Sequence, residues 1–233
     1  MTIIYQGPSQ LDGQPIVAIA TDNSDNAKTG KMLQTWIIRS DMDPISASRT
    51  GADASICGDC VHRGWAHNEP TGQAKKRSCY VTLVLAPLQV WKGFRRGIYL
   101  PAVDLRAIGR DRLVRIGSYG DGAAVPQQIW DELCAEARGW TAYTHQGNPD
   151  PDRFMTSVES VVQAQSAWAR GERTFRVVKG VDDLIAGSEI LCPASEEAGK
   201  RTTCAQCKLC AGASVAAKNI AIVAHGTGAR NWI

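Results

Sequence analysis

Seven of the eight cysteines fall into two groups whose spacing is typical of metal ligands. Three of them form C-x2-C-x2-C toward the C-terminal end, and a fourth lies upstream before a proline: Cys204, Cys207, Cys210 and Cys192. Thiolates at this spacing can reach the corners of a 4Fe–4S cubane, whereas structural zinc more often uses two separated C-x2-C pairs. We therefore predict a 4Fe–4S cluster on this four-cysteine group. Zinc is the alternative, and free thiols are the third interpretation.

The second group has only three cysteines: Cys57 and Cys60 in C-x2-C, and Cys79 farther along the chain. Three thiolates on a four-iron cluster leave one iron open for a substrate or cofactor. Alternatively, another residue completes the ligand set, and the candidates are His62, His67 and Cys134. We expect Cys134 in the core, because it lies on the apolar stripe of an expected helix, and both histidines in a solvated loop. Of these two possibilities, we predict the cluster with one open iron.

The composition is that of an ordinary globular protein. The 233 residues are 44% hydrophobic and 21% charged, enough for one large domain or two small ones. No run of 18 apolar residues and no signal peptide are visible, so we expect no membrane span and a cytoplasmic location. Thiols rarely pair as disulfides in that compartment, which favours metal binding. We predict one domain over 1–233, with 192–212 as its cluster-binding segment.

Strand and helix patterns alternate along most of the chain. A hairpin is predicted from the apolar runs 1–5 and 16–20. Further strands are predicted at 33–39, 80–85, 113–117, 140–144, 154–158, 174–178, 189–191 and 219–224. Helical spacing is present at 125–137, at 158–168 and, more weakly, at 100–108. This alternation predicts an α/β fold, as a complete or partial (β/α) barrel with cysteine-rich metal-binding loops, and a doubly wound sheet is the alternative.

Polar and ligating residues follow several of the predicted strands. They are Asp121, His145, Glu159, Cys192 and His225. Because barrel chemistry is found at the C-terminal ends of the strands, we predict that Asp121 and His145 are catalytic and share one cavity, with Glu159 as a further candidate. Gly117 and Gly120 lie in a glycine-rich segment between a strand and a helix. Their backbone N–H groups could bind an anionic part of a cofactor.

The charge is unevenly distributed. Residues 61–118 hold 11 Lys or Arg against 3 acids, a local charge of +8 in a chain whose net charge is +3. Such a sector could face nucleic acid, a phosphate-bearing cofactor or an acidic partner, although a solvated surface is the simplest interpretation. The alternative to an iron–sulfur protein is therefore a zinc-stabilised protein that binds nucleic acid or another partner through this sector.

Several further segments of the sequence are distinctive: NAKTGKMLQTW at 26–36, CGDC at 57–60, RIGSYGD at 115–121, WTAYTHQ at 140–146 and CPAS at 192–195. Together with the cysteines of both groups, these segments resemble a family of uncharacterised bacteriophage and plasmid proteins. The resemblance covers nearly the whole chain and implies the cytoplasm of a bacterial host as the location. It implies no particular activity.

A more distant similarity is to radical S-adenosylmethionine enzymes. These have a partial (β/α) barrel, a three-cysteine 4Fe–4S cluster and often an auxiliary cluster in a C-terminal extension. The similarity implies S-adenosylmethionine as a cofactor, although the C-x3-C-x2-C usual in those enzymes is absent here. We predict redox or radical chemistry on a small molecule, with the four-cysteine cluster passing electrons to the three-cysteine cluster in one cavity. The alternative is two independent structural metals.

Overall fold

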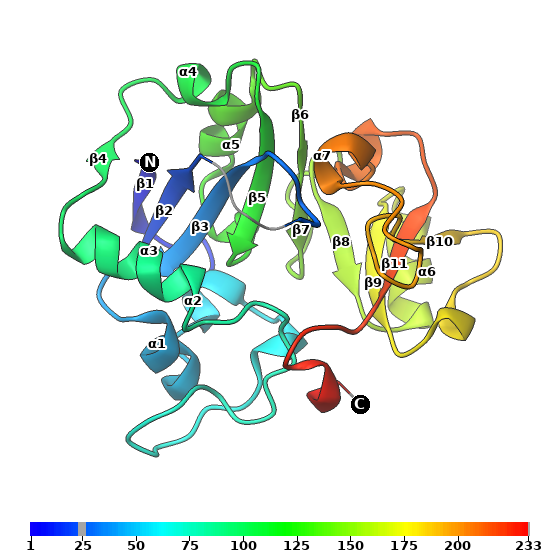
Figure 1. Ribbon diagram of the computed structural model, residues 1–233, viewed down its shortest axis with the longest axis horizontal. Coiled ribbons are helices and arrows are strands. Elements are labelled where there is room, and N and C mark those ends of the chain that lie inside the picture. Colours follow the sequence, from blue (N-terminus) through cyan, green and yellow to red (C-terminus); the bar gives the residue numbers. More distant parts are fainter. Residues whose placement is uncertain (23–26, 233) are drawn as a thin grey trace.

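The computed structural model describes residues 1–22 and 27–232, and its strands form two sheets that lie side by side (Figure 1). The first sheet has the order β4 (Leu100–Pro101), β1 (Thr2–Pro8), β2 (Pro15–Thr21), β3 (Leu33–Arg39), β5 (Leu113–Tyr119) and β6 (Gly139–Thr141). The second has the order β10 (Glu189–Leu191), β11 (Asn219–Val223), β9 (Thr174–Val178), β8 (Met155–Val158) and β7 (Tyr143–Thr144).

Most strand pairs are parallel. β2 pairs antiparallel with β1 and with β3, which confirms the predicted hairpin. The pairs β1–β4, β3–β5 and β5–β6 are parallel, as are all pairs of the second sheet. The predicted α/β class is therefore confirmed.

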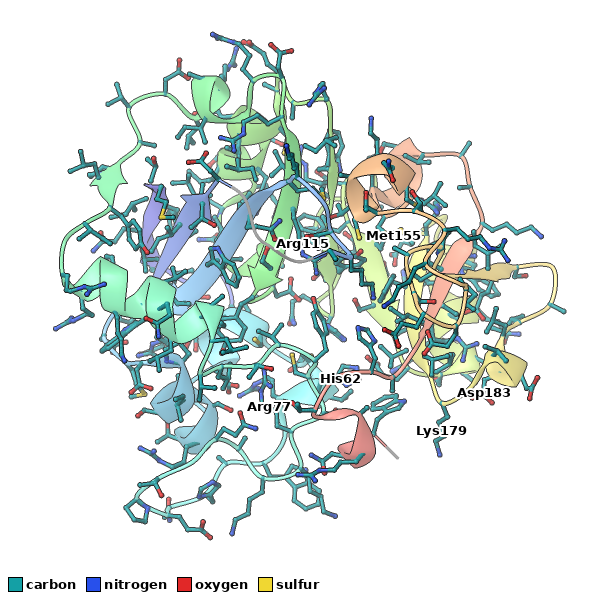
Figure 2. All side chains as sticks on the ribbon, in the orientation of Figure 1. His62, Arg77, Arg115, Met155, Lys179 and Asp183 are labelled. Atoms are coloured by element: carbon teal, nitrogen blue, oxygen red, sulfur yellow. The ribbon has the colours of Figure 1, made fainter. Side chains whose placement is uncertain are left out.

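A single residue of the chain connects the first sheet to the second. Only Ala142 separates β6 from β7; its N–H donates to the carbonyl of Cys210 (2.9 Å), and its own carbonyl accepts from the N–H of Met155 (3.0 Å). Arg115 of β5 and Met155 of β8 lie near this junction (Figure 2). The chain thus passes directly from one sheet to the other. A closed ring of strands is not among the pairings of residues 1–22 and 27–232.

Short helices connect and cover the strands. They are α1 (Pro44–Thr50), α2 (Ala54–Cys57), α3 (Ala86–Arg95), α4 (Leu105–Gly109), α5 (Gln127–Cys134), α6 (Val161–Ala169) and α7 (Cys204–Cys207), with 3₁₀ turns η1 (Val61–Arg63), η2 (Gly122–Ala124), η3 (Val181–Asp183), η4 (Gly212–Ser214) and η5 (Ala229–Asn231). Side-chain caps fix several of their first turns. Ser160, for example, accepts from the N–H of Gln163 at the start of α6. Within the described part of the chain, no helix is long and apolar enough to cross a membrane.

The core has two parts. The larger part surrounds β2 and β3, whose side chains are almost all buried, as expected for strands covered on both faces. The smaller part lies in the second sheet and contains Met155, Ile220 and Ile222 together with Cys192 and Cys210. Two of the predicted metal ligands are therefore held in a packed apolar environment.

The predicted strand at 80–85 is wrong. Arg77 donates to the carbonyls of Cys79 (3.1 Å) and Val81 (2.7 Å), so these groups are not available to pair with a neighbouring strand. The segment forms turns and leads into α3, which the sequence reading missed because β-branched residues precede it. The helix expected at 100–108 is β4 followed by α4, and the helix expected at 125–137 is the shorter α5, which begins after Pro126.

Candidate functional site

One cavity of about 380 Å³ is lined by residues of both sheets and by all seven clustered cysteines. Its lining also contains the polar residues that follow the strands: Asp121, His145, Glu159 and His225, along with Gly117 and Gly120. The structure therefore brings together every residue that the sequence analysis singled out as catalytic, cofactor-binding or metal-ligating. Of the three candidates for a fourth ligand, His62 also lines the cavity, whereas His67 and Cys134 do not.

Backbone hydrogen bonds place the four-cysteine group. Cys192 directly follows β10, and its N–H donates to the carbonyl of Ala221 at 2.8 Å. The N–H of Cys204, at the start of α7, donates to the carbonyl of Lys28 at 2.9 Å. Together with the bond between Ala142 and Cys210, these contacts tie the cysteines to three separate parts of the fold.

Arg173 holds the segment that follows α7. Its guanidinium, 8% exposed, donates to four backbone carbonyls at 2.6–3.0 Å: those of Leu209, Gly212, Ala217 and Lys218. This segment contains Cys210. The sequence analysis missed Arg173, because an arginine at the start of a strand carries no pattern that predicts such a role.

Two basic residues lie near the buried thiols of the four-cysteine group. Burial is the main reason that the pKa of the Cys210 thiol is raised to about 12; Tyr143 opposes the increase, and the neighbouring cysteines add to it. Lys28 and Arg115 line the same part of the cavity and interact electrostatically with Cys204. Cations placed in this way offset the negative charge of a thiolate-ligated metal.

The three-cysteine group lies on the loop between β3 and α3. Cys57 ends α2, Cys60 precedes η1, and the N–H of Cys79 donates to the carbonyl of His62 at 3.0 Å. Arg63 shapes the turn between the first two cysteines: it pairs with Asp53 (2.8 Å) and donates to the carbonyl of Gly58 (2.7 Å). Cys79 is followed by turns and not by the strand predicted at 80–85, but its hydrogen bond to His62 of η1 keeps it with the other two cysteines.

The sulfur atoms of neither group converge on one point as the ligands of a single bound ion would. Among the described residues, no three of the seven sulfurs lie within 4.8 Å of one another. Tetrahedral zinc with Zn–S bonds of about 2.3 Å would bring its sulfur ligands to about 3.8 Å from one another. The spacing is thus wider than a single ion requires.

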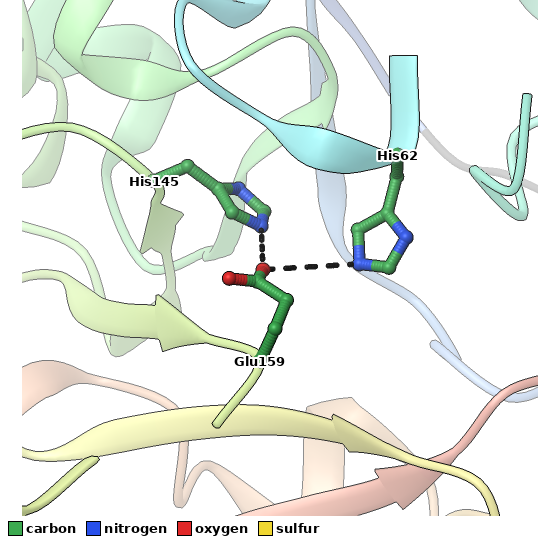
Figure 3. Close-up of side chains that lie close together, drawn as sticks. All are labelled: His62, His145 and Glu159. Atoms are coloured by element: carbon green, nitrogen blue, oxygen red, sulfur yellow. Dashed lines mark ion pairs between the residues drawn. The ribbon is translucent and has the colours of Figure 1, made fainter. Parts of the chain in front are cut away.

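His62, His145 and Glu159 converge beside the three-cysteine group (Figure 3). Glu159 Oε1 lies 3.0 Å from His145 Nε2 and 3.9 Å from His62 Nε2, and His145 Nε2 lies 3.8 Å from Cys60 Sγ. Burial, with a contribution from His145, lowers the pKa of His62 to about 4. Burial also acts to lower the pKa of His145, but Cys60 and Glu159 outweigh it and raise that pKa well above the ordinary value.

The sequence predicted the environment of Cys134 correctly and that of His62 incorrectly. His62 is 8% exposed and its ring lies 4.5 Å from that of Trp232, so the expected solvated histidine is wrong. The signal that could have found it is its position two residues after Cys60. His67 is hydrogen-bonded within its own loop: Nε2 donates to the carbonyl of Gln73 (2.9 Å), and Nδ1 accepts from the N–H of Glu69 (3.2 Å). Cys134 is buried in the first core, as predicted.

Asp121 is a positioning residue in this structure. It is 6% exposed, and its carboxylate accepts from the N–H groups of Ala123 (3.0 Å) and His145 (2.8 Å). Burial raises its pKa, although these two bonds oppose the increase. Asp121 thus fixes the backbone that carries the His145 ring.

The backbone conformation at positions 117 and 120 requires glycine. Both have left-handed φ values, 70° and 84°. A Cβ on Gly117 would lie 2.5 Å from the carbonyl oxygen of Gly120, and one on Gly120 would lie 2.7 Å from Ile37 Cβ. Their conformation therefore accounts for the glycines without an anion, and the predicted anion binding stays a prediction.

We expect Gly120→Ala to destabilise the protein by at least about 2 kcal/mol, because it combines a left-handed backbone with a clash against β3. Urea unfolding measures the change. Gly147→Ala is the matched control, since its Cβ would meet nothing within 4 Å, and it should change stability by less than about 0.5 kcal/mol. Equal stability of the two variants would contradict the prediction.

More than half of the basic sector is engaged within the protein. Arg77 and Arg115 are buried, and four more residues form ion pairs with acids: Arg63 with Asp53, Lys75 with Glu69, Arg110 with Glu136, and Arg112 with Asp22. Five of the 11 basic residues are therefore left for an external partner. This distribution weakens the case for a nucleic-acid interface on residues 61–118.

The fold and the site together define a mixed α/β protein with a cysteine-lined cavity between two mostly parallel sheets. No family model matches the sequence, and no curated protein or solved structure is significantly similar to it. The function must therefore be argued from the geometry of the cavity.

Proposed function

We propose that the protein binds two 4Fe–4S clusters and carries out redox or radical chemistry on a small molecule held between them. One observation carries this proposal: two cysteine groups that are far apart in the sequence line the same cavity. Structural metals act locally and have no need to face one another. A shared cavity instead suits a closed four-thiolate cluster that relays electrons to a three-thiolate cluster with one iron open to the substrate.

The spacing of the cysteines in the sequence favours clusters over zinc. A cubane spreads its thiolate ligands over separate iron corners, whereas zinc gathers its ligands around one ion. The absence of any three sulfurs within 4.8 Å of one another, among the described residues, fits the first arrangement. If the chemistry is radical chemistry, we propose that S-adenosylmethionine binds at the open iron.

The residues that follow three of the strands also support it. β5, β7 and β8 are followed by Asp121, His145 and Glu159, which all line the cavity. This is where a partial (β/α) barrel would place its chemistry. The eight cysteines are free, and a reducing cytoplasm would keep them available for metal. If the resemblance to bacteriophage proteins holds, this is the cytoplasm of the host.

Metal and sulfide analysis of anaerobically purified protein tests the proposal. We expect a brown protein with about eight iron and eight sulfide per chain, as two four-iron clusters require. Colourless protein that contains zinc and no sulfide would overturn the proposal. If that protein also bound DNA with an affinity that falls steeply with salt, the nucleic-acid alternative would replace it.

A further inference from the structure

We infer that His62, His145 and Glu159 form a site for one divalent transition-metal ion, separate from the cysteine clusters. Their ligand atoms all lie within 4.8 Å of one another, and they come from three segments: η1, the residue after β7 and the residue after β8. The proposed clusters need none of the three. The site therefore adds a third metal centre to the cavity and does not depend on the other two.

The donor set has a recognisable chemistry. The two imidazole nitrogens point toward Glu159 Oε1, which lies between them (Figure 3). Two histidines and one carboxylate hold a divalent ion on one face and leave its other coordination positions open. Because all three residues line the cavity, those open positions face the space in which a small molecule would bind.

A second observation points to a ligand at this site. His62 is 8% exposed, yet its Nε2 has no hydrogen-bond partner among the described residues. Its other nitrogen, Nδ1, lies 2.8 Å from Ser78 Oγ. A proton on Nδ1 would be donated to Ser78 and would leave the lone pair of Nε2 directed at Glu159. Outer hydrogen bonds of this kind orient histidine ligands in metal sites.

The simplest alternative is an ion pair between Glu159 and a protonated His145. That pair accounts for two of the three residues but leaves the buried Nε2 of His62 without a partner. A second alternative assigns His145 to the three-cysteine cluster, since its Nε2 lies 3.8 Å from Cys60 Sγ. The experiment below separates both alternatives from a metal site.

Mn²⁺ is the appropriate probe, because it prefers oxygen and nitrogen ligands to thiolates. We would titrate Mn²⁺ into the anaerobically purified protein and follow the free ion by electron paramagnetic resonance. One Mn²⁺ should bind per chain. Glu159→Gln should weaken binding by more than about 100-fold, and Ser78→Ala, which removes only the outer hydrogen bond, by about 10-fold. Glu132→Gln, on the exposed side of α5, should bind as the unaltered protein does.

Iron and sulfide are measured in the same samples, along with the thermal unfolding temperature. Loss of Mn²⁺ binding in Glu159→Gln with unchanged iron would support the separate site. Failure of the unaltered protein to bind Mn²⁺, or equal binding by Glu159→Gln, would overturn it. Loss of iron in His145→Ala would also overturn it, by making His145 a cluster ligand while the proposed function stands. If the protein contains no iron at all, the titration still decides whether this site exists.

Discussion

Replacing Cys207 with serine should remove the iron of one cluster and leave the other in place. Total iron should fall by about half, because each group holds a four-iron cluster in the proposed function. The soluble yield should fall as well, since binding at a closed metal site is coupled to folding of the segment that holds it. Cys60→Ser should remove the other half of the iron, and iron and sulfide analysis of both variants measures these losses.

Cys134→Ala is the matched control for both cysteine variants. Its thiol is buried in the first core and away from the cavity lining, so it should keep all of its iron and lose about 1 kcal/mol of stability. Loss of iron in this variant would make Cys134 a ligand of the three-cysteine cluster. Full iron in both Cys204→Ser and Cys207→Ser would contradict the four-cysteine assignment.

Arg173→Met should destabilise the protein by about 3 kcal/mol, because it leaves four backbone carbonyls without their donor, one of them in a buried hydrogen bond and three in partly buried ones. The loop from Leu209 to Lys218 contains Cys210, so the same variant should lose iron from the four-cysteine group. Arg173→Lys should recover little of either property, since one ammonium cannot reproduce the planar set of donors. Urea unfolding and iron analysis measure the two effects.

The same substitution at Arg138, whose side chain is exposed, provides the comparison. Arg138→Met should keep its iron and stay within about 0.5 kcal/mol of the unaltered protein. If Arg173→Met matched Arg138→Met in stability and iron content, the guanidinium would have no role in holding the cysteine loop.

The pattern of hydrophobic and β-branched residues predicted the bounds of several strands correctly. β3, β9 and β10 have the predicted bounds; β3 and β9 pair with a strand on each side, and β10 pairs with β11 at the edge of its sheet. The segment 80–85 has a similar composition, but Arg77, which lies just before it in the chain, binds the carbonyls of Cys79 and Val81. That bond depends on the path of the chain and has no signature in the segment itself.

In the candidate site, too, the sequence predicted some of the important residues and missed others. Cysteine spacing identified seven residues that all line the cavity, and the positions after strands identified His145 and Glu159. Arg63, Arg173 and the burial of His62 were missed. Each of these depends on contacts between segments that only the folded chain brings together, such as the ring contact between His62 and Trp232. Spacing alone therefore found the ligands but not the groups that hold them.

In the proposed function, the contact between His62 and Trp232 would also constrain when the clusters can be inserted during biosynthesis. A ribosome releases residues 57–79 long before residues 192–232, so the three cysteines of the first group emerge without the cavity wall that later covers them. Domains fold from the N-terminal side as synthesis proceeds, but this cavity cannot close until residues 192–232 have been synthesised. Insertion of the proposed clusters would then follow the synthesis of these residues, on a chain whose cavity does not yet enclose its cysteines. Such a precursor would require a reductant and an iron donor, and its thiols would be open to oxidation.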